Sequence, residues 1–227
     1  MKACFQKMFC KPFFKKKKTL KKFQKKNLSH SSKLWLTRQL NDPLVAEAKK
    51  QNYRSRAVFK LIEINDKHKF LKNNLKIVDL GAAPGSWSQY SSKINNMGFN
   101  LALDLLSTEP IVNCEIIKGD FTDLLMQENL IKKIKGEKFD IVLSDIAENS
   151  TGNRSLDSMR SNIISIEVMH FALKCLKKNG TILIKTFSGN GNQEVVAFAK
   201  KNFSKHLFIK PKSSRKDSKE LYLYCIL

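Results

Sequence analysis

The stretch that most constrains the fold of this chain runs from Ile77 to Trp87 and reads IVDLGAAPGSW. Apolar residues flank one acid, Asp79, and this pattern predicts a short buried strand. Gly81 and Gly85 then enclose a turn of small residues, after which a helix is expected to begin. A strand that passes through a glycine turn into a helix is typical of the nucleotide-binding corner of a doubly wound α/β sheet. Glycine there lets the backbone approach a ligand, and the helix N-terminus offers unpaired N–H groups.

The glycine spacing narrows the choice of nucleotide. A dinucleotide site needs G-x-G-x-x-G, in which the third glycine packs the helix against the strand. Here residues 82 and 83 are alanine, and no third glycine follows in register. The D-x-G-x-x-x-G spacing from Asp79 to Gly85 resembles instead the S-adenosylmethionine (SAM) motif of Rossmann-like methyltransferases. An ordinary βα loop remains the alternative interpretation of this stretch taken alone.

Composition limits the remaining possibilities. A chain of 227 residues, 42% of them hydrophobic, can hold one α/β domain and a short appendage. It has no run of about 18 apolar residues and no apolar leader with a cleavage site, so neither a membrane span nor secretion is expected. The odd number of cysteines favours reduced thiols in a cytoplasmic protein, and without a C-x-x-C pair structural zinc is not expected. The cysteines are Cys4, Cys10, Cys114, Cys175 and Cys225.

The net charge of +22 indicates a polyanionic partner, and nucleic acid is the usual one. Residues 1–41 contain thirteen Lys or Arg and no acid, which leaves about +9 on the rest of the chain. A genome rich in A·T pairs would also raise the lysine content, but it would not remove every acid from this segment. Residues 1–30 are therefore expected to form a flexible basic arm that contacts phosphates. A mitochondrial presequence is the alternative, although such segments prefer Arg and Ser.

After the arm, the hydrophobic periodicities predict one domain over residues 31–227. Strands are expected at 75–80, 100–104, 114–118, 139–143, 181–184, 207–210 and 221–227. Helices are expected at 31–40, 44–49, 57–66, 86–96, 124–135, 156–178 and 193–202. Ser55 should be the N-cap of the third helix, and Asn179-Gly180 should end the sixth. The last two strands have only a loop between them and should pair antiparallel.

The fold class that follows is α/β and Rossmann-like, of the kind found in SAM-dependent methyltransferases. We expect a seven-stranded, mostly parallel sheet with one antiparallel strand and helices on both faces. The second strand ends on Asp104, about twenty residues after the glycine turn. A carboxylate at that position normally accepts hydrogen bonds from the two hydroxyls of a ribose.

Five segments resemble, in order and without large gaps, the FtsJ-type ribosomal RNA 2′-O-methyltransferases. They are residues 55–60 (SRAVFK), 79–90 (DLGAAPGSWSQY), 144–149 (SDIAEN), 184–185 (IK) and 213–220 (SSRKDSKE). The resemblance covers roughly residues 31–227. It implies SAM as the cofactor, and it implies 2′-O-methylation of a uridine ribose in large-subunit ribosomal RNA. The expected partner is therefore ribosomal RNA or the large ribosomal subunit, and we expect a monomer.

The resemblance also implies site residues. The Lys-Asp-Lys-Glu tetrad of the family matches Lys60, Asp145, Lys185 and Glu220, and Lys185 is the expected general base. The cofactor contacts of the family match Gly85, Trp87, Asp104, Asp120 and Asp145, and no metal is expected. Of these, Asp104 should bind the ribose and Asp120 the adenine edge, while Trp87 could equally be a plain core residue.

Elementary chemistry agrees with a lysine base. A ribose hydroxyl is a very weak acid, so methyl transfer needs it positioned and hydrogen-bonded to a base. A lysine loses its proton more easily when it is buried or lies beside another cation. Taken singly, each tetrad residue could be a surface ion pair. Four such residues at the ends of separate elements are harder to explain in that way.

Two departures from the family pattern are visible. Glu148 stands where the family usually has Pro, and Ser86 stands where a second glycine is common. Both bear on loop rigidity and on the fit of the RNA.

We further expect the arm, Arg54, Arg56 and residues 210–219 to form a basic surface beside the active site.

Other functions stay open. The enzyme could act on transfer RNA or on a messenger cap, because such ribose methylases share the tetrad. A non-catalytic, RNA-binding ribosome assembly factor is the alternative from another class, although it would not need the tetrad. A nicotinamide-dependent oxidoreductase is disfavoured by the glycine spacing and by the charge.

Overall fold

The computed structural model describes residues 30–147 and 151–227. The described chain divides into two units, one that ends at Val45 and one that runs from Ala46 to Leu227. In the first unit, α1 (His30–Asn41) is followed by the start of α2 (Pro43–Lys50). The side chain of Asp42 lies at this junction, and its Oδ1 accepts the N–H of Leu44 at 3.0 Å. The predicted arm lies outside the described residues except for His30, so its flexibility stays a prediction.

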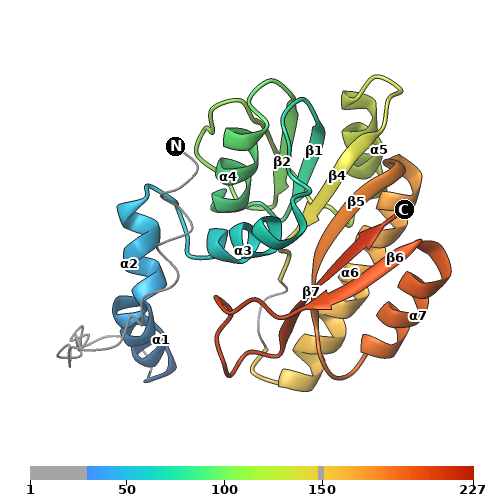
Figure 1. Cartoon of the computed structure of the whole chain (residues 1–227). Coiled ribbons are helices and arrows are strands. Elements are labelled where there is room, and N and C mark those ends of the chain that lie inside the picture. Colours follow the sequence, from blue (N-terminus) through green and yellow to red (C-terminus); the bar gives the residue numbers. More distant parts are fainter. Residues whose placement is uncertain (1–29, 148–150) are drawn as a thin grey trace. The chain divides into compact units, whose positions relative to one another are not determined.

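The second unit is built on a seven-stranded sheet with the strand order β3-β2-β1-β4-β5-β7-β6 (Figure 1). Strands β1 to β5 pair in parallel, whereas β7 runs antiparallel to both of its neighbours, β5 and β6. The predicted fold class is thereby confirmed, including the antiparallel pairing of the last two strands. The strands are β1 (Lys76–Leu80), β2 (Phe99–Asp104), β3 (Glu115–Lys118), β4 (Phe139–Ser144), β5 (Leu176–Phe187), β6 (Lys205–Ile209) and β7 (Glu220–Ile226).

Helices cover both faces of this sheet, because the strands carry apolar side chains on each face and both sets must be buried. On one face, Leu61 and Trp87 from α3 and α4 pack with Leu143 and Tyr222 of the sheet. On the other face, α5, α6 and α7 pack over a larger core that includes Phe171. The helices are α3 (Val58–His68), α4 (Ser86–Ile94), α5 (Leu124–Lys133), α6 (Arg154–Cys175) and α7 (Asn192–Asn202).

The predicted N-cap of α3 is wrong. The helix begins at Val58, and its N-cap residue Ala57 makes no side-chain capping bond. The hydroxyl of Ser55 accepts the N–H of Ala57 at 3.2 Å and lies 2.8 Å from the hydroxyl of Ser86 on α4. The serine thus keeps a local hydrogen bond just before α3 and also contacts α4.

The predicted end of α6 is also wrong. The helix stops at Cys175, and Leu176 is already extended and fully buried opposite Phe139 of β4. Asn179 does adopt a positive φ, but its N–H donates to the carbonyl of Leu227 at 3.0 Å. Asn179-Gly180 therefore shapes the entry into β5. Burial of Leu176 against the sheet decided the boundary over the local stop signal.

The buried residues of α6 include small ones, such as Ser165 and Ala172, beside large ones, such as Met169 and Phe171. Ser165 and Ala172 are buried, whereas Leu156, Met159 and Ile163 are 38%, 48% and 47% exposed. Small side chains allow the helix backbone to approach the sheet closely. The Ser165 hydroxyl can therefore donate to the carbonyl of Lys185 at 2.8 Å.

No helix within residues 30–147 and 151–227 has both the length and the apolar character needed to cross a bilayer. In the same part of the chain, Cys114, Cys175 and Cys225 form no disulfide. Cys4 and Cys10 lie outside the described residues.

Asp79 is an acid within the core on β1. Its Oδ2 accepts the hydroxyl of Ser88 at 2.5 Å, whereas Oδ1 is buried and has no hydrogen-bond partner among the described residues. Burial raises the pKa of the Asp79 carboxyl to about 7, against the lowering effect of the Ser88 hydrogen bond. The nearby charges of Asp145 and Asp104 raise this pKa further. The protonated form is favoured because the folded protein cannot solvate the carboxylate there.

Asp79→Asn should therefore change how stability depends on pH. Between about pH 4 and about pH 7 the unfolded state has lost this proton and the folded state still holds it. Wild-type stability should thus fall relative to the variant as pH rises through this window, by about 4 kcal/mol at most. Below and above this pH window, the difference in unfolding free energy between the wild type and the variant should be constant. Urea unfolding of both proteins at several pH values measures it, and a pH-independent difference would contradict the prediction.

Candidate active site

Four residues of the predicted tetrad meet at the carboxyl edge of the sheet. Asp145 directly follows β4, Lys185 lies near the end of β5, and Glu220 opens β7. Because β7 is antiparallel to β5, its first residue lies at the edge where β5 ends. Lys60 comes from the first turn of α3. The structure therefore brings together residues that are far apart in the sequence.

Lys185 and Tyr222 both bind the carboxylate of Asp145. The ammonium Nζ of Lys185 donates to Asp145 Oδ1 at 3.1 Å and to the main-chain oxygen of Asp145 at 3.0 Å. The phenol of Tyr222 donates to the same Oδ1 at 2.7 Å. Lys185 and Tyr222 are direct partners in the β5–β7 register, so both side chains project from the same face.

A second ion pair lies beside the first. Lys60 Nζ is 3.0 Å from Glu220 Oε2, and it lies 5.5 Å from the centre of the Tyr222 ring. The side chains of Lys60 and Glu220 are 12% and 11% exposed, and those of Lys185 and Asp145 are 8% and 18% exposed. The two cations and two anions thus form a compact, nearly neutral group with restricted access to water.

The electrostatics keep this group ionised at Asp145 and neutral at Tyr222. Burial alone would raise the pKa of Asp145, but the ammonium groups of Lys185 and Lys60 outweigh it and hold that pKa below its ordinary value. Burial and the charge of Asp145 raise the pKa of Tyr222 well above its ordinary value. Tyr222 therefore keeps its proton and acts as a donor to Asp145.

Tyr222 was missed by sequence reasoning. It lies two residues after Glu220, and residues two apart on a strand share one face. The alternation of side chains along the strand could therefore have indicated that Tyr222 faces the same site as Glu220. Asn162 was missed as well, because it lies in the middle of α6. Its side chain donates to the carbonyls of Phe187 and Asn190 at 3.0 and 2.9 Å, and it fixes the chain just after Lys185.

The predicted cofactor residues lie along the same edge, next to the tetrad. Asp104 ends β2, and its carboxylate accepts two main-chain N–H groups. Oδ2 accepts from Ala83 in the glycine turn (residues 81–85), and Oδ1 accepts from Leu106, both at 2.8 Å. Each carboxylate oxygen can accept a second hydrogen bond. Asp104 could therefore still accept the two hydroxyls of a ribose.

Asp120 follows β3 and is exposed. Both hydrogen bonds that it accepts, from the N–H and the hydroxyl of Thr122, go to Oδ1, at 2.8 and 2.7 Å. Among the described residues none donates to Oδ2, which could accept from an amino group of a base. Trp87 is 2% exposed within the core, where its indole N–H donates to the carbonyl of Ala57 at 2.9 Å. Its role toward a cofactor stays a prediction.

The two glycines of the turn are required by the protein itself. Gly81 and Gly85 have φ values of +72° and +103°, which disfavour any other residue. A Cβ on Gly81 would lie 2.4 Å from Cγ1 of Ile146, and a Cβ on Gly85 would lie 2.7 Å from Cδ1 of Ile111. The turn is thus packed directly against the residue after Asp145 and against the loop after β2.

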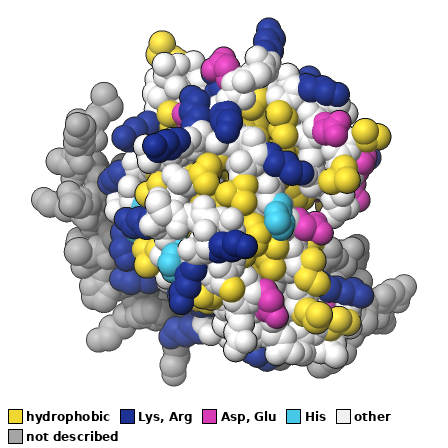
Figure 2. All heavy atoms as spheres, turned by 90° about the vertical axis from the view of Figure 1, so that its right-hand side faces the viewer, with side chains coloured by type: hydrophobic (Ala, Val, Ile, Leu, Met, Phe, Trp, Pro, Cys, Tyr) yellow, Lys and Arg dark blue, Asp and Glu magenta, His cyan; other side chains and the backbone are white. Residues whose placement is uncertain are grey.

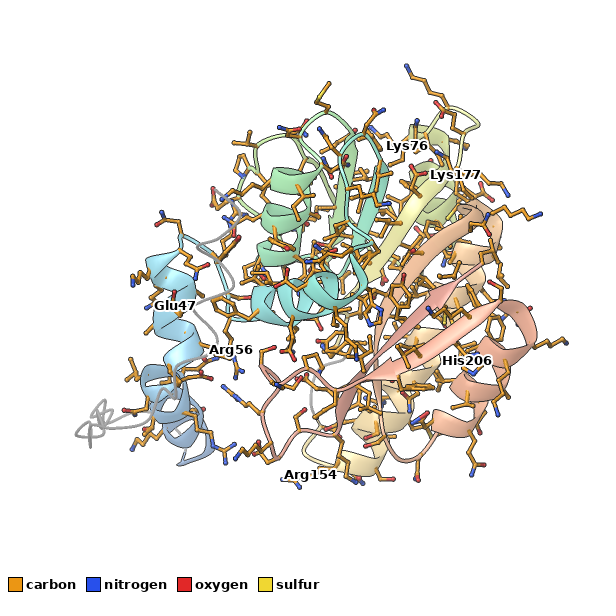
Figure 3. The ribbon with its side chains drawn as sticks, viewed as in Figure 1. Glu47, Arg56, Lys76, Arg154, Lys177 and His206 are labelled. Carbon is orange, nitrogen blue, oxygen red and sulfur yellow. The ribbon has the colours of Figure 1, made fainter. Side chains whose placement is uncertain are left out.

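The predicted basic surface divides between two places. Arg56 donates to the carbonyl of Ser213 in the loop between β6 and β7, and Figure 3 shows it beside that loop. Glu63 of α3 accepts the N–H groups of Lys212 and Ser213 at 2.7 and 3.1 Å, and so anchors the same loop. Arg54 instead binds the segments around the glycine turn.

Of the two departures from the family pattern, Ser86 is explained by the structure, because its hydroxyl pairs with that of Ser55. Glu148 and Asn149 lie outside the described residues. Among residues 30–147 and 151–227, no three His, Cys, Asp or Glu side chains are placed to hold a metal ion.

Comparison with known proteins shows which family has a matching sequence and fold. The profile of the FtsJ-like methyltransferase family matches residues 53–226. The ribosomal RNA large subunit methyltransferase E of Pelagibacter ubique is 43% identical over 194 residues, which cover 86% of this chain and 95% of that protein. A crystal structure of a ribosomal RNA methyltransferase from Plasmodium falciparum is 31% identical, with a TM-score of 0.69 over 77% of this chain and 97% of that one.

A more distant structure supports the fold alone. Human methyltransferase-like protein 13, crystallised with SAH, is 12% identical, with a TM-score of 0.54 over 75% of this chain and 79% of that one. The family profile spans the glycine turn and all four tetrad residues. This chain belongs to the FtsJ-like methyltransferase family.

Proposed function

We propose that this protein is a SAM-dependent methyltransferase that methylates the 2′-hydroxyl of a uridine in large-subunit ribosomal RNA. The observation that carries the proposal is the buried group of Lys60, Asp145, Lys185 and Glu220 at the carboxyl edge of the sheet. The Pelagibacter ubique relative is named as a ribosomal RNA methyltransferase, and its 43% identity to this chain supports the substrate class. The uridine and the 2′ position come from the resemblance to the FtsJ-type enzymes.

In this proposal Lys185 is the general base. When bound, the cofactor would supply an activated methyl group on a sulfonium, with a neutral thioether as the leaving group. Lys185 first loses a proton to solvent, and its neutral Nζ then accepts the proton of the 2′-hydroxyl as the new O–C bond forms. Asp145 Oδ1 accepts a hydrogen bond from this nitrogen at 3.1 Å and one from the phenol of Tyr222 at 2.7 Å, so Tyr222 positions the carboxylate that holds the base. Lys60, paired with Glu220 at 3.0 Å, lies beside this group.

The residues present fit the cofactor. Asp104 has spare acceptor capacity for the ribose hydroxyls, and Asp120 presents Oδ2 for the adenine amino group. Gly85 belongs to the turn that would approach the cofactor, and Asp145 lies at the boundary between the cofactor and the acceptor. We assign these four residues to cofactor binding. Trp87 would act by supporting the turn from the core.

The charge of the protein supports a nucleic-acid substrate. The net charge is +22, and Lys and Arg side chains are spread over the face that carries α7 and β6 (Figure 2). Arg56 and the loop between β6 and β7 lie close to Glu220, so RNA phosphates could bind beside the tetrad. Non-specific phosphate contacts supply affinity, and the active site then selects the nucleotide.

Lys185→Arg tests the base. A guanidinium keeps both the positive charge and the ion pair with Asp145, but it cannot release a proton at an accessible pH. Single-turnover methyl transfer to ribosomal particles should fall by at least about 100-fold, with SAM affinity nearly unchanged. Lys177→Arg is the matched control on the same strand, because Lys177 pairs with Asp140 at 2.8 Å at the opposite edge of the sheet. A fully active Lys185→Arg enzyme would sink the base assignment.

Asp104→Ala tests the cofactor site. The loss of a charged acceptor should weaken SAM binding by about 1–3 kcal/mol in a calorimetric titration. Asp123→Ala is the control, because Asp123 is the N-cap of α5, with its carboxylate bonded to the N–H of Leu125. That variant should bind SAM like the wild type. Equal SAM affinity of the Asp104 variant and the wild type would remove Asp104 from the site.

Removal of residues 1–30 tests the RNA contact of the arm, which carries eleven lysines. Each phosphate contact releases counterions, so RNA affinity should fall steeply with salt, and the truncated protein should show a shallower slope. Catalysis at saturating RNA should survive the truncation. An unchanged slope would show that the arm does not contact RNA.

The same measurements separate the enzyme from a non-catalytic assembly factor. Such a factor would bind ribosomal RNA with the same salt dependence. It would neither bind SAM nor lose any activity when Lys185 is replaced.

A further inference from the structure

Arg54 joins two segments that flank the proposed cofactor site. Its Nη1 donates to the carbonyl of Pro84 at 3.0 Å and to the carbonyl of Glu109 at 2.8 Å. Its Nη2 donates to the carbonyl of Pro110 at 2.8 Å. Pro84 belongs to the glycine turn, and the other two belong to the β2–β3 loop (residues 105–114). One guanidinium therefore spans the turn and the loop.

Asp104 bridges the same two segments. Its carboxylate accepts N–H groups from Ala83 in the turn and from Leu106 in the loop, both at 2.8 Å. Arg54 and Asp104 thus form complementary braces: the cation holds carbonyl groups, and the anion holds N–H groups. Charge-assisted hydrogen bonds of this kind are stronger than neutral ones, and the planar guanidinium has a fixed fork geometry.

The packing around Gly85 gives an independent sign of the same arrangement. A Cβ at Gly85 would lie 2.8 Å from Nη1 of Arg54 and 3.0 Å from Cγ2 of Thr108. The guanidinium and the β2–β3 loop therefore cover the turn directly, and only glycine leaves room for them. The backbone of Arg54 is itself fixed on α4, because its N–H donates to Oε1 of Gln89 at 3.0 Å.

These contacts leave Arg54 little capacity for an RNA phosphate. Three of its five N–H donors are used on main-chain carbonyls, including both donors of Nη1. Among the described residues no carboxylate forms an ion pair with it. Arg56, two residues later, instead reaches the loop between β6 and β7. The two arginines of one short motif therefore serve opposite sides of the site.

We propose that Arg54 is a positioning residue for the cofactor, which acts by locking the β2–β3 loop onto the glycine turn. Asp104 then points its free acceptor positions at the ribose from a fixed frame. This inference rests on the proposed function, because it assigns Arg54 to the SAM side of that same site. It also separates Arg54 from the basic RNA-binding surface to which the sequence alone assigned it.

The test uses the full chain with Arg54→Ala, Arg54→Lys and, as matched control, Arg56→Ala. SAM affinity is measured by calorimetry, and RNA affinity is measured by fluorescence anisotropy. Arg54→Ala should lose at least about tenfold in SAM affinity while its RNA affinity stays near that of the wild type. The SAM affinity of Arg54→Lys should lie between those of Arg54→Ala and the wild type, because one ammonium cannot reach all three carbonyls. Arg56→Ala should show the reverse pattern, with weaker RNA binding and unchanged SAM binding.

Two further readouts separate a positioning role from a general loss of structure. Hydrogen exchange of residues 105–114 in the cofactor-free protein should be faster in Arg54→Ala than in the wild type, with exchange in β4 and β5 unchanged. In turnover, the KM for SAM should rise while kcat at saturating SAM changes little. If Arg54→Ala fails to fold, the same comparison with Arg54→Lys decides.

The outcomes distinguish the possible failures. Unchanged SAM affinity with reduced RNA affinity in Arg54→Ala would overturn the inference and make Arg54 a phosphate contact. Reduced SAM affinity without faster loop exchange would overturn the bracing role. A wild-type protein that does not bind SAM would sink the proposed function instead, and the exchange of residues 105–114 would still test the brace.

Discussion

The carboxylate of Asp145 sets the conditions for the rest of the candidate site. It is largely withdrawn from water at the end of β4, and it accepts hydrogen bonds from Lys185 and Tyr222 on one oxygen. A buried carboxylate that lost such partners would cost the fold about 3–5 kcal/mol. The partners must therefore be present in the folded protein before any substrate arrives. The stability of the folded protein and the position of the proposed base thus depend on the same contacts.

Sheet topology makes these contacts possible. Asp145 and Lys185 follow from neighbouring parallel strands, so both arrive at the carboxyl edge. Tyr222 and Glu220 reach the same edge only because β7 runs antiparallel and inserts between β5 and β6. A parallel β7 would have carried Glu220 to the far end of the sheet. The single reversed strand therefore completes the tetrad.

Direct packing joins the proposed cofactor side of the site to the proposed acceptor side. Gly81 packs against Ile146, which directly follows Asp145, and a side chain at position 81 would displace it. Asp104 and Arg54 hold the glycine turn to the β2–β3 loop from two sides. A shift in the turn would therefore reach Asp145 through direct packing. Methyl transfer depends on alignment of two reactants, and a rigid connection of this kind supports it.

The sequence by itself determined the order of strands and helices and the glycine turn, whereas the four tetrad positions came from the resemblance to the FtsJ-type enzymes. The strands, the helices and the turn are encoded locally, as hydrophobic periods and turn residues. The tertiary structure decided that Ser55 pairs with Ser86, that α6 yields to β5 at Leu176, and that Tyr222 binds Asp145. It also decided that Arg54 binds Pro84 and Glu109. Each of these depends on a partner distant in the chain, and a hydrogen bond or a buried contact with that partner outweighs a local preference.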